Sequence, residues 1–182
     1  MRNITDHILD IVQNSIRAKA TLIEIIVEEN KKDDFYILTI KDNGCGMNME
    51  TLRKAADPFF TSRKTRGVGL GLSLLKQKAE TTGGSFSIRS KEGEGTEVEA
   101  VFRLSDVDRP PLGDIAEMFY LMMVSNEQID FYYRHFTQKG TFEIRSEEIK
   151  NELEGVSFKE REIKEAILEL IKNNLKDIEA TN

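Results

Sequence analysis

The sequence contains a single cysteine, Cys45, among its 182 residues. This scarcity excludes an intrachain disulfide and a zinc site built from cysteines. The sequence also lacks any apolar run of the roughly 18–20 residues that a transmembrane helix needs. Its first ten residues, MRNITDHILD, lack the apolar stretch of a signal peptide. We therefore expect a cytoplasmic protein without a membrane span.

Acidic side chains outnumber basic ones, 32 to 26, and the net charge of −6 argues against a nucleic acid as the main partner. The charge is unevenly spread, because residues 1–104 carry 16 basic and 15 acidic side chains whereas residues 105–182 carry 10 and 17. This change coincides with the segment SDVDRPPLGD, whose Pro-Pro pair ends regular structure. We place a boundary near residue 106, between a domain of residues 1–106 and a small acidic domain of residues 107–182.

Hydrophobic periodicity in the first domain switches between helical and strand spacing. It predicts a helix over residues 4–20 with Thr5 or Asp6 as its cap, strands over residues 21–29 and 35–42, a short helix capped by Asn48, a helix from about residue 70 to 82, and strands over residues 85–90 and 95–104. Helices and hairpins in this order predict an α/β fold, a two-layer α/β sandwich with a mixed or antiparallel sheet. Residues 107–182 add an amphipathic helix, a hairpin and two helices, a small C-terminal α+β module.

The sequence GVGLGL, residues 67–72, leads directly into one of the predicted helices. The first turn of a helix presents unpaired N–H groups and the positive end of the helix dipole, so glycines before it allow a phosphate to approach the backbone. A Rossmann turn would need a strand just upstream, which TSRKTR does not provide, and the lysine and spacing of a P-loop are missing. For this motif alone, a glycine-rich surface loop is an equal alternative.

The sequence KDNGCGM follows the second predicted strand at once and contains Asp42, Gly44 and Gly46. A carboxylate at a strand end, beside glycines that leave room for a flat ring, can accept a hydrogen bond from the exocyclic amine of adenine. An ordinary turn is the alternative, whereas a calcium loop is excluded because its further carboxylates are missing. A third stretch, GEGT, ends in Thr96, whose hydroxyl could bind the same base directly or through water. For this stretch alone, a hairpin turn is the favoured alternative.

Asp10, Asn14 and Arg17 are spaced by four and three residues and therefore share one face of the first helix. The Asn14 amide lies on a face that otherwise packs inward and needs a partner. A magnesium ion bound to phosphates would supply one, because Mg²⁺ prefers hard oxygen ligands. Arg17 could contact a phosphate and Asp10 could orient a water or a hydroxyl. For these two residues, the polar edge of an ordinary helix is the alternative.

In this order, the motifs resemble those of the gyrase, heat-shock chaperone, histidine-kinase and MutL ATPase superfamily, which has the Bergerat ATP-binding fold. DIVQNSIRA is similar to its N-box, DPFFTSR to its phenylalanine box, and DNGCGM, GVGLGL and GEGT to its three glycine boxes. The resemblance covers residues 1–104 and implies ATP and Mg²⁺ as ligands. It assigns the metal to Asn14, the adenine to Asp42 and Thr96, and the phosphates to Gly69 and Gly71, beneath a lid of residues 57–68. The full set of ATP-binding residues that it implies is Asn14, Arg17, Asp42, Gly44, Gly46, Met47, Phe60, Thr61, Arg63, Lys64, Gly67, Val68, Gly69, Leu70, Gly71, Leu72 and Thr96.

Two parts of the sequence favour different subfamilies. FFTSRKTRGVGLGLSL is closest to sensor histidine kinases, whereas DIVQNSIRAKATLIEI is equally similar to MutL. In MutL a glutamate four residues before the asparagine acts as the base for hydrolysis. Asp10 holds that position here, is one methylene shorter and is the candidate catalytic residue. Sensor kinases also carry an upstream phosphoacceptor histidine. We expect the only histidines, His7 and His135, to be structural, so the chain should be a catalytic module without its own phosphoacceptor domain.

Two classes of function are compatible with these motifs. As an enzyme, the protein would hydrolyse ATP or transfer its γ-phosphate to a protein in trans, as histidine kinases and anti-sigma serine kinases do. As a switch, it would close on ATP and change which partner binds, with little or no turnover. The expected partners are ATP and a protein similar to a response regulator, an anti-sigma antagonist or a metabolic enzyme, and a dimer is compatible with both classes.

Overall fold

The β-branched segments of the first half of the chain form four strands of one sheet. They are β1 (Leu22–Asn30), β2 (Phe35–Asp42), β3 (Ser85–Lys91) and β4 (Gly95–Arg103) in the computed structural model, which describes residues 3–55, 71–153 and 155–181. Burial alternates along β1, β2 and β4, so one face of the sheet is packed and the other is more open. The neighbours β1–β2, β2–β4 and β4–β3 are antiparallel, and all four strands were predicted from the sequence.

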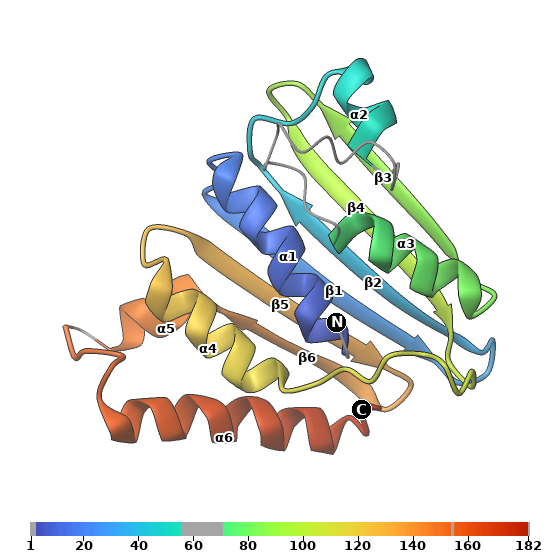
Figure 1. The fold of residues 1–182 in the computed structure, drawn as a ribbon. Helices are drawn as coiled ribbons and strands as arrows, with labels where there is room; N and C mark the ends of the chain where they lie inside the picture. Colours follow the sequence, from blue (N-terminus) through green and yellow to red (C-terminus); the bar gives the residue numbers. More distant parts are fainter. Residues whose placement is uncertain (1–2, 56–70, 154, 182) are drawn as a thin grey trace.

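Helices α1 (Ile4–Arg17) and α3 (Gly71–Thr81) pack against each other beside the sheet, and α2 (Met49–Ala55) lies near the end of β3 (Figure 1). The cap of α1 is Asn3, whose side-chain oxygen accepts the N–H of Asp6 at 2.8 Å, and the predicted caps Thr5 and Asp6 are wrong. The cap differs from the prediction because a segment about a hundred residues away contacts the start of α1. The carbonyls of residues 111–112 accept the N–H groups of Ile4 and Thr5 at 2.8 and 3.0 Å, so both residues belong to the first turn of α1 and Asn3 precedes it as the cap.

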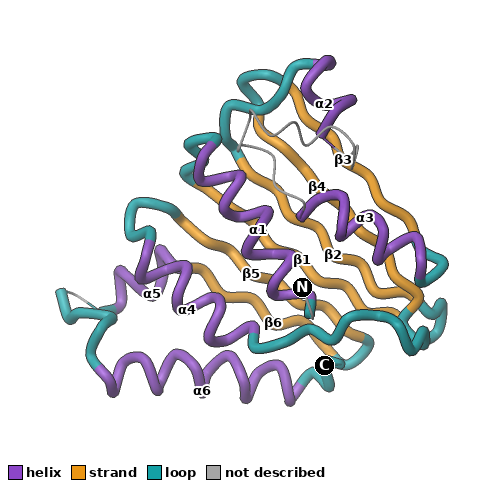
Figure 2. Tube along the Cα trace, viewed as in Figure 1, coloured by secondary structure: helices purple, strands orange, loops and turns teal. Residues whose placement is uncertain are grey.

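The second half of the chain extends the same sheet. It contributes α4 (Ile115–Ser125), β5 (Asp130–Thr137), β6 (Gly140–Arg145), α5 (Ser146–Glu152) and α6 (Arg161–Asp177). Strand β5 runs parallel to β1, which gives a six-stranded mixed sheet of order β3-β4-β2-β1-β5-β6 (Figure 2). The protein is thus a two-layer α/β fold with one sheet, to which residues on both sides of the predicted boundary near residue 106 contribute strands. The division into a domain of residues 1–106 and a second domain stays a prediction.

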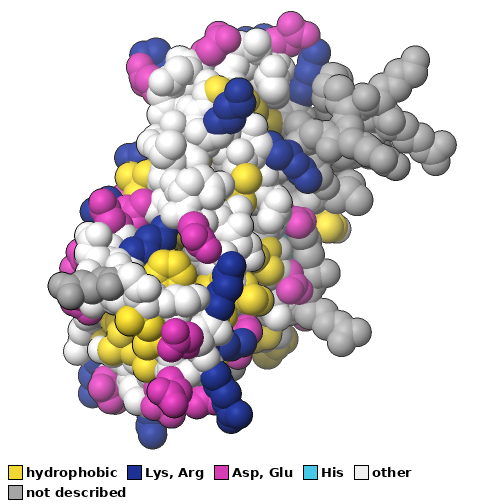
Figure 3. Space-filling model, turned by 90° about the vertical axis from the view of Figure 1, so that its left-hand side faces the viewer, with side chains coloured by type: hydrophobic (Ala, Val, Ile, Leu, Met, Phe, Trp, Pro, Cys, Tyr) yellow, Lys and Arg dark blue, Asp and Glu magenta, His cyan; other side chains and the backbone are white. Residues whose placement is uncertain are grey.

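The outer surface mixes charges of both signs. Figure 3 shows basic and acidic side chains interspersed with hydrophobic ones over one side of the molecule. Within the described ranges, no helix is both long and apolar enough to cross a bilayer. The apolar side chains instead form one core, whose largest fully buried members include Tyr36, Phe102, Phe119, Phe131 and Tyr133.

A chain of buried polar side chains links β1, β5 and the C-terminal residues. The Glu29 carboxylate accepts hydrogen bonds from His135 Nε2 at 2.7 Å and from both the backbone N–H and the hydroxyl of Thr181, at 2.8 and 2.7 Å. The Tyr133 hydroxyl lies 2.7 Å from His135 Nδ1. Burial raises the pKa of Glu29, but the hydrogen bonds from His135 and Thr181 outweigh it, so this pKa lies below its usual range. As expected from the sequence, His135 has a structural environment.

We expect Thr181→Val to lower the free energy of unfolding by about 1 kcal/mol at neutral pH, because it removes one hydrogen bond to an ionised carboxylate. The pKa of Glu29 is depressed in the folded state. Stabilisation by Glu29 is therefore fully present above the usual glutamate pKa of about 4.3 and is lost as the pH falls through the folded-state value. Urea denaturation should show the difference between wild type and variant shrinking below about pH 4. Thr141→Val on β6 is the control, and a difference that does not depend on pH would contradict this role.

Candidate functional site

A cavity of about 250 Å³ opens where the end of α1 meets the ends of β2 and the β3–β4 hairpin. Apolar side chains form much of its wall, among them Ile11, Ala55, Ile88 and Val98. Predicted site residues from several separate stretches of the sequence also line it, namely Asn14, Arg17, Asp42, Gly46, Met47, Leu72 and Thr96. The fold therefore brings together the first helix, the two described glycine-containing turns and the start of α3.

Asp42 is the last residue of β2 and is only 8% exposed, with Thr96 of β4 as its partner in the sheet register. Its Oδ2 accepts a hydrogen bond from the Ser15 hydroxyl at 2.6 Å, and its Oδ1 accepts one from the N–H of Gly44 at 2.9 Å. These two donors fix the orientation of the carboxylate. Because an ionised carboxylate has about four acceptor positions, it can still accept a hydrogen bond from a molecule in the cavity.

The turn of residues 42–47 lies against the β3–β4 hairpin so closely that two positions require glycine. Gly46 has a φ of +64°, and a Cβ there would lie 1.9 Å from the carbonyl oxygen of Lys91. Gly95 has a φ of +105°, and a Cβ there would lie 1.9 Å from the carbonyl oxygen of Asp42. The N–H of Gly93 also donates to the Cys45 carbonyl at 2.8 Å. The first and third glycine-containing motifs therefore form a single wall of the cavity.

Two serines that the sequence reasoning missed connect these motifs. Ser15 is 2% exposed and joins α1 to Asp42. The Ser90 hydroxyl accepts the N–H of Met47 at 2.8 Å, donates to the Gly95 carbonyl at 2.8 Å and lies 2.9 Å from the Thr96 hydroxyl. Ser15 could have been noticed as the neighbour of Asn14, whereas nothing in the local sequence distinguishes Ser90.

The polar edge of α1 at the cavity is formed by Asn14 and Arg17. The Asn14 side-chain oxygen accepts a hydrogen bond from the Arg17 guanidinium at a long 3.3 Å. Within the described ranges, no group of three or more His, Cys, Asp or Glu side chains could hold a metal ion. Asn14 offers one hard oxygen ligand at the cavity, and the further ligands of a metal held there could come from a bound molecule or from water.

Asp10 lies one turn before Asn14 but is not among the residues that line the cavity. Its side chain packs against Gly71, the first residue of α3, where an added Cβ would lie 2.7 Å from Asp10 Oδ2. Burial raises the pKa of Asp10, with a smaller opposing effect from Arg17. Asp10 is thus placed at the start of α3, against Gly71, one of the two predicted phosphate-binding glycines.

His7 occupies the preceding turn of α1 and is 1% exposed. Its Nδ1 has no hydrogen-bond partner in the part of the chain that the structure describes. Burial lowers the pKa of His7, while the backbone of Gly71 acts in the opposite direction. The ring is therefore packed between α1 and the start of α3, in agreement with the structural role expected for it.

Several predicted site residues lie outside the described residues. The same holds for the phenylalanine box, residues 57–63, and for residues 67–70 of the second glycine box. These site residues belong to the predicted lid of residues 57–68 and to the glycines that follow it, and comprise Phe60, Thr61, Arg63, Lys64, Gly67, Val68, Gly69 and Leu70.

The arrangement agrees with a family comparison. The family described as histidine kinase-, DNA gyrase B- and HSP90-like ATPase matches residues 2–106. Because this match covers more than half of the chain, the protein belongs to that ATPase family. The expected superfamily is confirmed, and so is the α/β fold.

Individual relatives are sensor and sporulation kinases. The chain is 34% identical over 89 residues to Sporulation kinase E of Bacillus subtilis, which is 48% of this chain and 12% of that relative. It is 39% identical over 79 residues to Sensor protein SrrB of Staphylococcus aureus, 41% of this chain and 13% of the relative. The chain spans between 12% and 18% of the length of such curated relatives.

Among solved structures, the Aquifex aeolicus MutL ATPase domain complexed with ADP is similar, with a TM-score of 0.51 and 17% identity over 85% of this chain and 68% of that chain. The N-terminal domain of a DNA repair protein has a TM-score of 0.53 and 17% identity, covering 80% of this chain and 52% of that one. At this identity the likeness shows the fold alone. It extends beyond residue 106, since residues 2–106 are a smaller share of the chain than either structure covers.

Proposed function

We propose that the protein binds ATP in the cavity at the end of α1, with the adenine at Asp42 and Thr96. The buried Asp42 carboxylate supports this assignment most directly. Ser15 and Gly44 hold it at the cavity, and it retains acceptor capacity for the exocyclic amine of the base. Apolar walls with a few convergent polar groups are typical of small-molecule sites. The similar MutL domain was solved with ADP.

We infer that Asn14 would hold the magnesium ion of Mg-ATP. One amide oxygen suffices, because Mg²⁺ in nucleotide sites takes most of its ligands from phosphates and water. When bound, the ion would neutralise phosphate charge. Arg17 is close enough to Asn14 to contact a phosphate, and the start of α3 at Gly71 presents the positive end of a helix dipole.

We propose that ATP is consumed at this site, by hydrolysis or by transfer of the γ-phosphate to a partner protein. Asp10 is the candidate that orients the attacking water or the acceptor hydroxyl. It lies on the same helix as Asn14 and against the first residue of α3. Burial raises the pKa of Asp10 above its usual value, and a higher pKa makes a carboxylate a stronger general base. The kinase names of the relatives support a protein as the acceptor. We propose that the reaction takes place in the cytoplasm.

The second candidate function is a switch in which ATP is bound with little turnover. One observation favours it: Asp10 does not line the cavity. Release of ADP from Mg-ATP, measured with and without an added response-regulator-like protein, separates the two. ADP release or labelling of the added protein supports the enzyme. Tight binding without either supports the switch, and no binding of Mg-ATP by calorimetry would overturn both.

We expect Ser15→Ala to weaken ATP binding by about fivefold, because it removes one of the two donors that orient Asp42, a loss on the order of 1 kcal/mol. Calorimetric titration with Mg-ATP measures the change. Ser125→Ala, at the end of α4 and remote from the cavity, is the matched control. If Ser15→Ala binds ATP as tightly as the wild type, Asp42 does not depend on this hydrogen bond for its position.

A further inference from the structure

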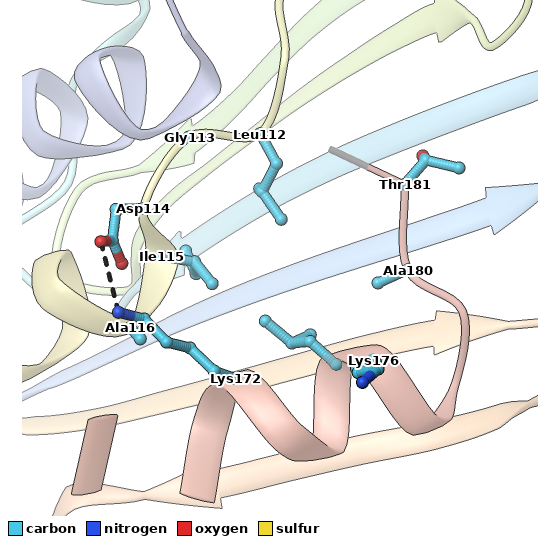
Figure 4. A pocket seen from close by; sticks show the side chains of 10 residues that line it. Leu112, Gly113, Asp114, Ile115, Ala116, Lys172, Lys176, Ala180 and Thr181 are labelled. Atoms are coloured by element: carbon cyan, nitrogen blue, oxygen red, sulfur yellow. Dashed lines mark ion pairs between the residues drawn. The ribbon is translucent and has the colours of Figure 1, made fainter. Parts of the chain in front are cut away.

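A second cavity, of about 540 Å³, lies on the other side of α1, between the first turn of α4 and the last turns of α6 (Figure 4). Its apolar lining comes from Leu112, Ile115, Ala116, Leu175 and Ala180. None of these residues belongs to the ATP site proposed above. The volume falls within the range of small-molecule sites, roughly 300–1,000 Å³.

Among the described residues that line this cavity, one cation has no carboxylate partner in the described part of the chain. Lys172 pairs with Asp114 at 3.7 Å, and Asp114 also accepts the N–H of Glu117, so both side chains are engaged. Lys176, one turn further along α6, lines the cavity and has no carboxylate within 4.0 Å in the described part of the chain. The first turn of α4 adds the positive end of a helix dipole to the same space. The cavity is therefore complementary to a ligand with one negative charge and an apolar body.

The walls are fixed by contacts that reach into the core. On one side, Thr181 makes both of its hydrogen bonds to the buried Glu29 carboxylate, which His135 holds in turn. On the other side, the carbonyls of Pro111 and Leu112 accept N–H groups of α1. The cavity is thus built by residues anchored to the central sheet and to α1, and a ligand would meet a site that is already formed.

We propose that this cavity is an effector site for a small organic anion, such as a medium-chain carboxylate, with the anionic group at Lys176 and the apolar body against Leu112, Ile115 and Leu175. The site is connected to the ATP cavity by α1. Leu112 lines the effector site, and its carbonyl accepts an N–H group of the first turn of α1. The last turn of the same helix carries Asn14 and Arg17, which line the ATP cavity. The binding part of this proposal stands on the second cavity alone, whereas the effector part rests on the proposed function.

Octanoate is the probe for the binding part, titrated without nucleotide into ¹⁵N-labelled protein and followed by NMR. We expect saturable shifts centred on residues 113–116 and 175–176. 1-Octanol, which lacks the charge, should bind at least threefold more weakly. Lys176→Gln should weaken octanoate binding by roughly threefold to fivefold, the weight of a partly exposed charge pair. Lys32→Gln, the same change in the exposed β1–β2 turn, should have no effect. Shifts centred elsewhere, or equal binding by Lys176→Gln and wild type, would overturn the site.

The effector part is tested by titrating Mg-ATP with and without saturating octanoate. Coupling between two sites is reciprocal, so a change in ATP affinity of at least threefold should be matched by the same change in octanoate affinity when ATP is present. Lys176→Gln should reduce this coupling while leaving ATP binding without octanoate unchanged. Octanoate binding with unaltered ATP affinity would overturn the effector role. Octanoate binding in a protein that binds no ATP would overturn the proposed function and the effector role, but leave the anion site in place.

Discussion

Asp42→Asn is expected to weaken ATP binding by roughly thirtyfold or more, about 2 kcal/mol. The N–H₂ group of the amide could face the adenine amine. The amide also lies beside two hydrogen-bond donors, the Ser15 hydroxyl and the N–H of Gly44, which both donate to the Asp42 carboxylate in the wild type. Whichever way the amide turns, at least one donor then faces another donor. Calorimetric titration with Mg-ATP measures the loss.

Inosine triphosphate separates a lost base contact from a distorted cavity. It carries a carbonyl where adenine has the exocyclic amine, so wild-type protein should bind it much more weakly than ATP, and Asp42→Asn should largely abolish this preference. Asp108→Asn, in the exposed segment before α4, is the control for the charge change. A variant that keeps both its ATP affinity and its preference for adenine would show that Asp42 does not contact the base.

Much of the fold could be predicted because the pattern that builds it is local. Alternation of apolar residues predicted the strands of the β1–β2 and β3–β4 hairpins, and Asn48 does cap α2, where its side chain accepts the N–H of Thr51 at 2.9 Å. The prediction of a helix cap was wrong where groups distant in the sequence accept the N–H groups of the first turn. Thr5 or Asp6 is predicted as the cap of α1, but the carbonyls of residues 111–112 accept the N–H groups of Ile4 and Thr5, and Asn3 is the cap. The parallel pairing of β5 with β1 likewise joins segments about a hundred residues apart, for which periodicity carries no signal.

The candidate site shows the same division. Asp42 and Thr96 could be chosen from their places at strand ends next to glycines, and they do lie opposite each other in the sheet. Ser90 could not, because its role depends on a contact 43 residues away in the sequence. Ser15 could be noticed beside Asn14, but its hydrogen bond to Asp42, 27 residues away, could not be foreseen. Asp10 is predicted as a site residue from its helical spacing from Asn14 and from the resemblance of its position to that of the MutL glutamate. That spacing places both on one face, but it could not foresee that Asp10 packs against Gly71.

Asp10→Asn is expected to leave ATP binding nearly unchanged and to lower turnover by roughly a hundredfold or more, the typical weight of a general base. The side chain lies at the start of α3, outside the adenine cavity, so its removal should affect the reaction rather than the base contact. Single-turnover release of ADP measures the chemical step, and calorimetry measures binding. Asp108→Asn again controls for the loss of one carboxylate.

The pH profile tests the same role independently. Burial raises the pKa of Asp10 above its usual value, and a base acts only when ionised. Turnover by the wild type should therefore fall as the pH drops through this raised pKa, at a higher pH than an exposed aspartate would give. The residual turnover of Asp10→Asn should lack that acidic limb. Asp10→Glu, which restores the carboxylate with one more methylene, should recover turnover and the limb together. If Asp10→Asn keeps both the rate and the limb, Asp10 is a structural contact of α1 with α3, and a group other than Asp10 activates the attacking water or hydroxyl.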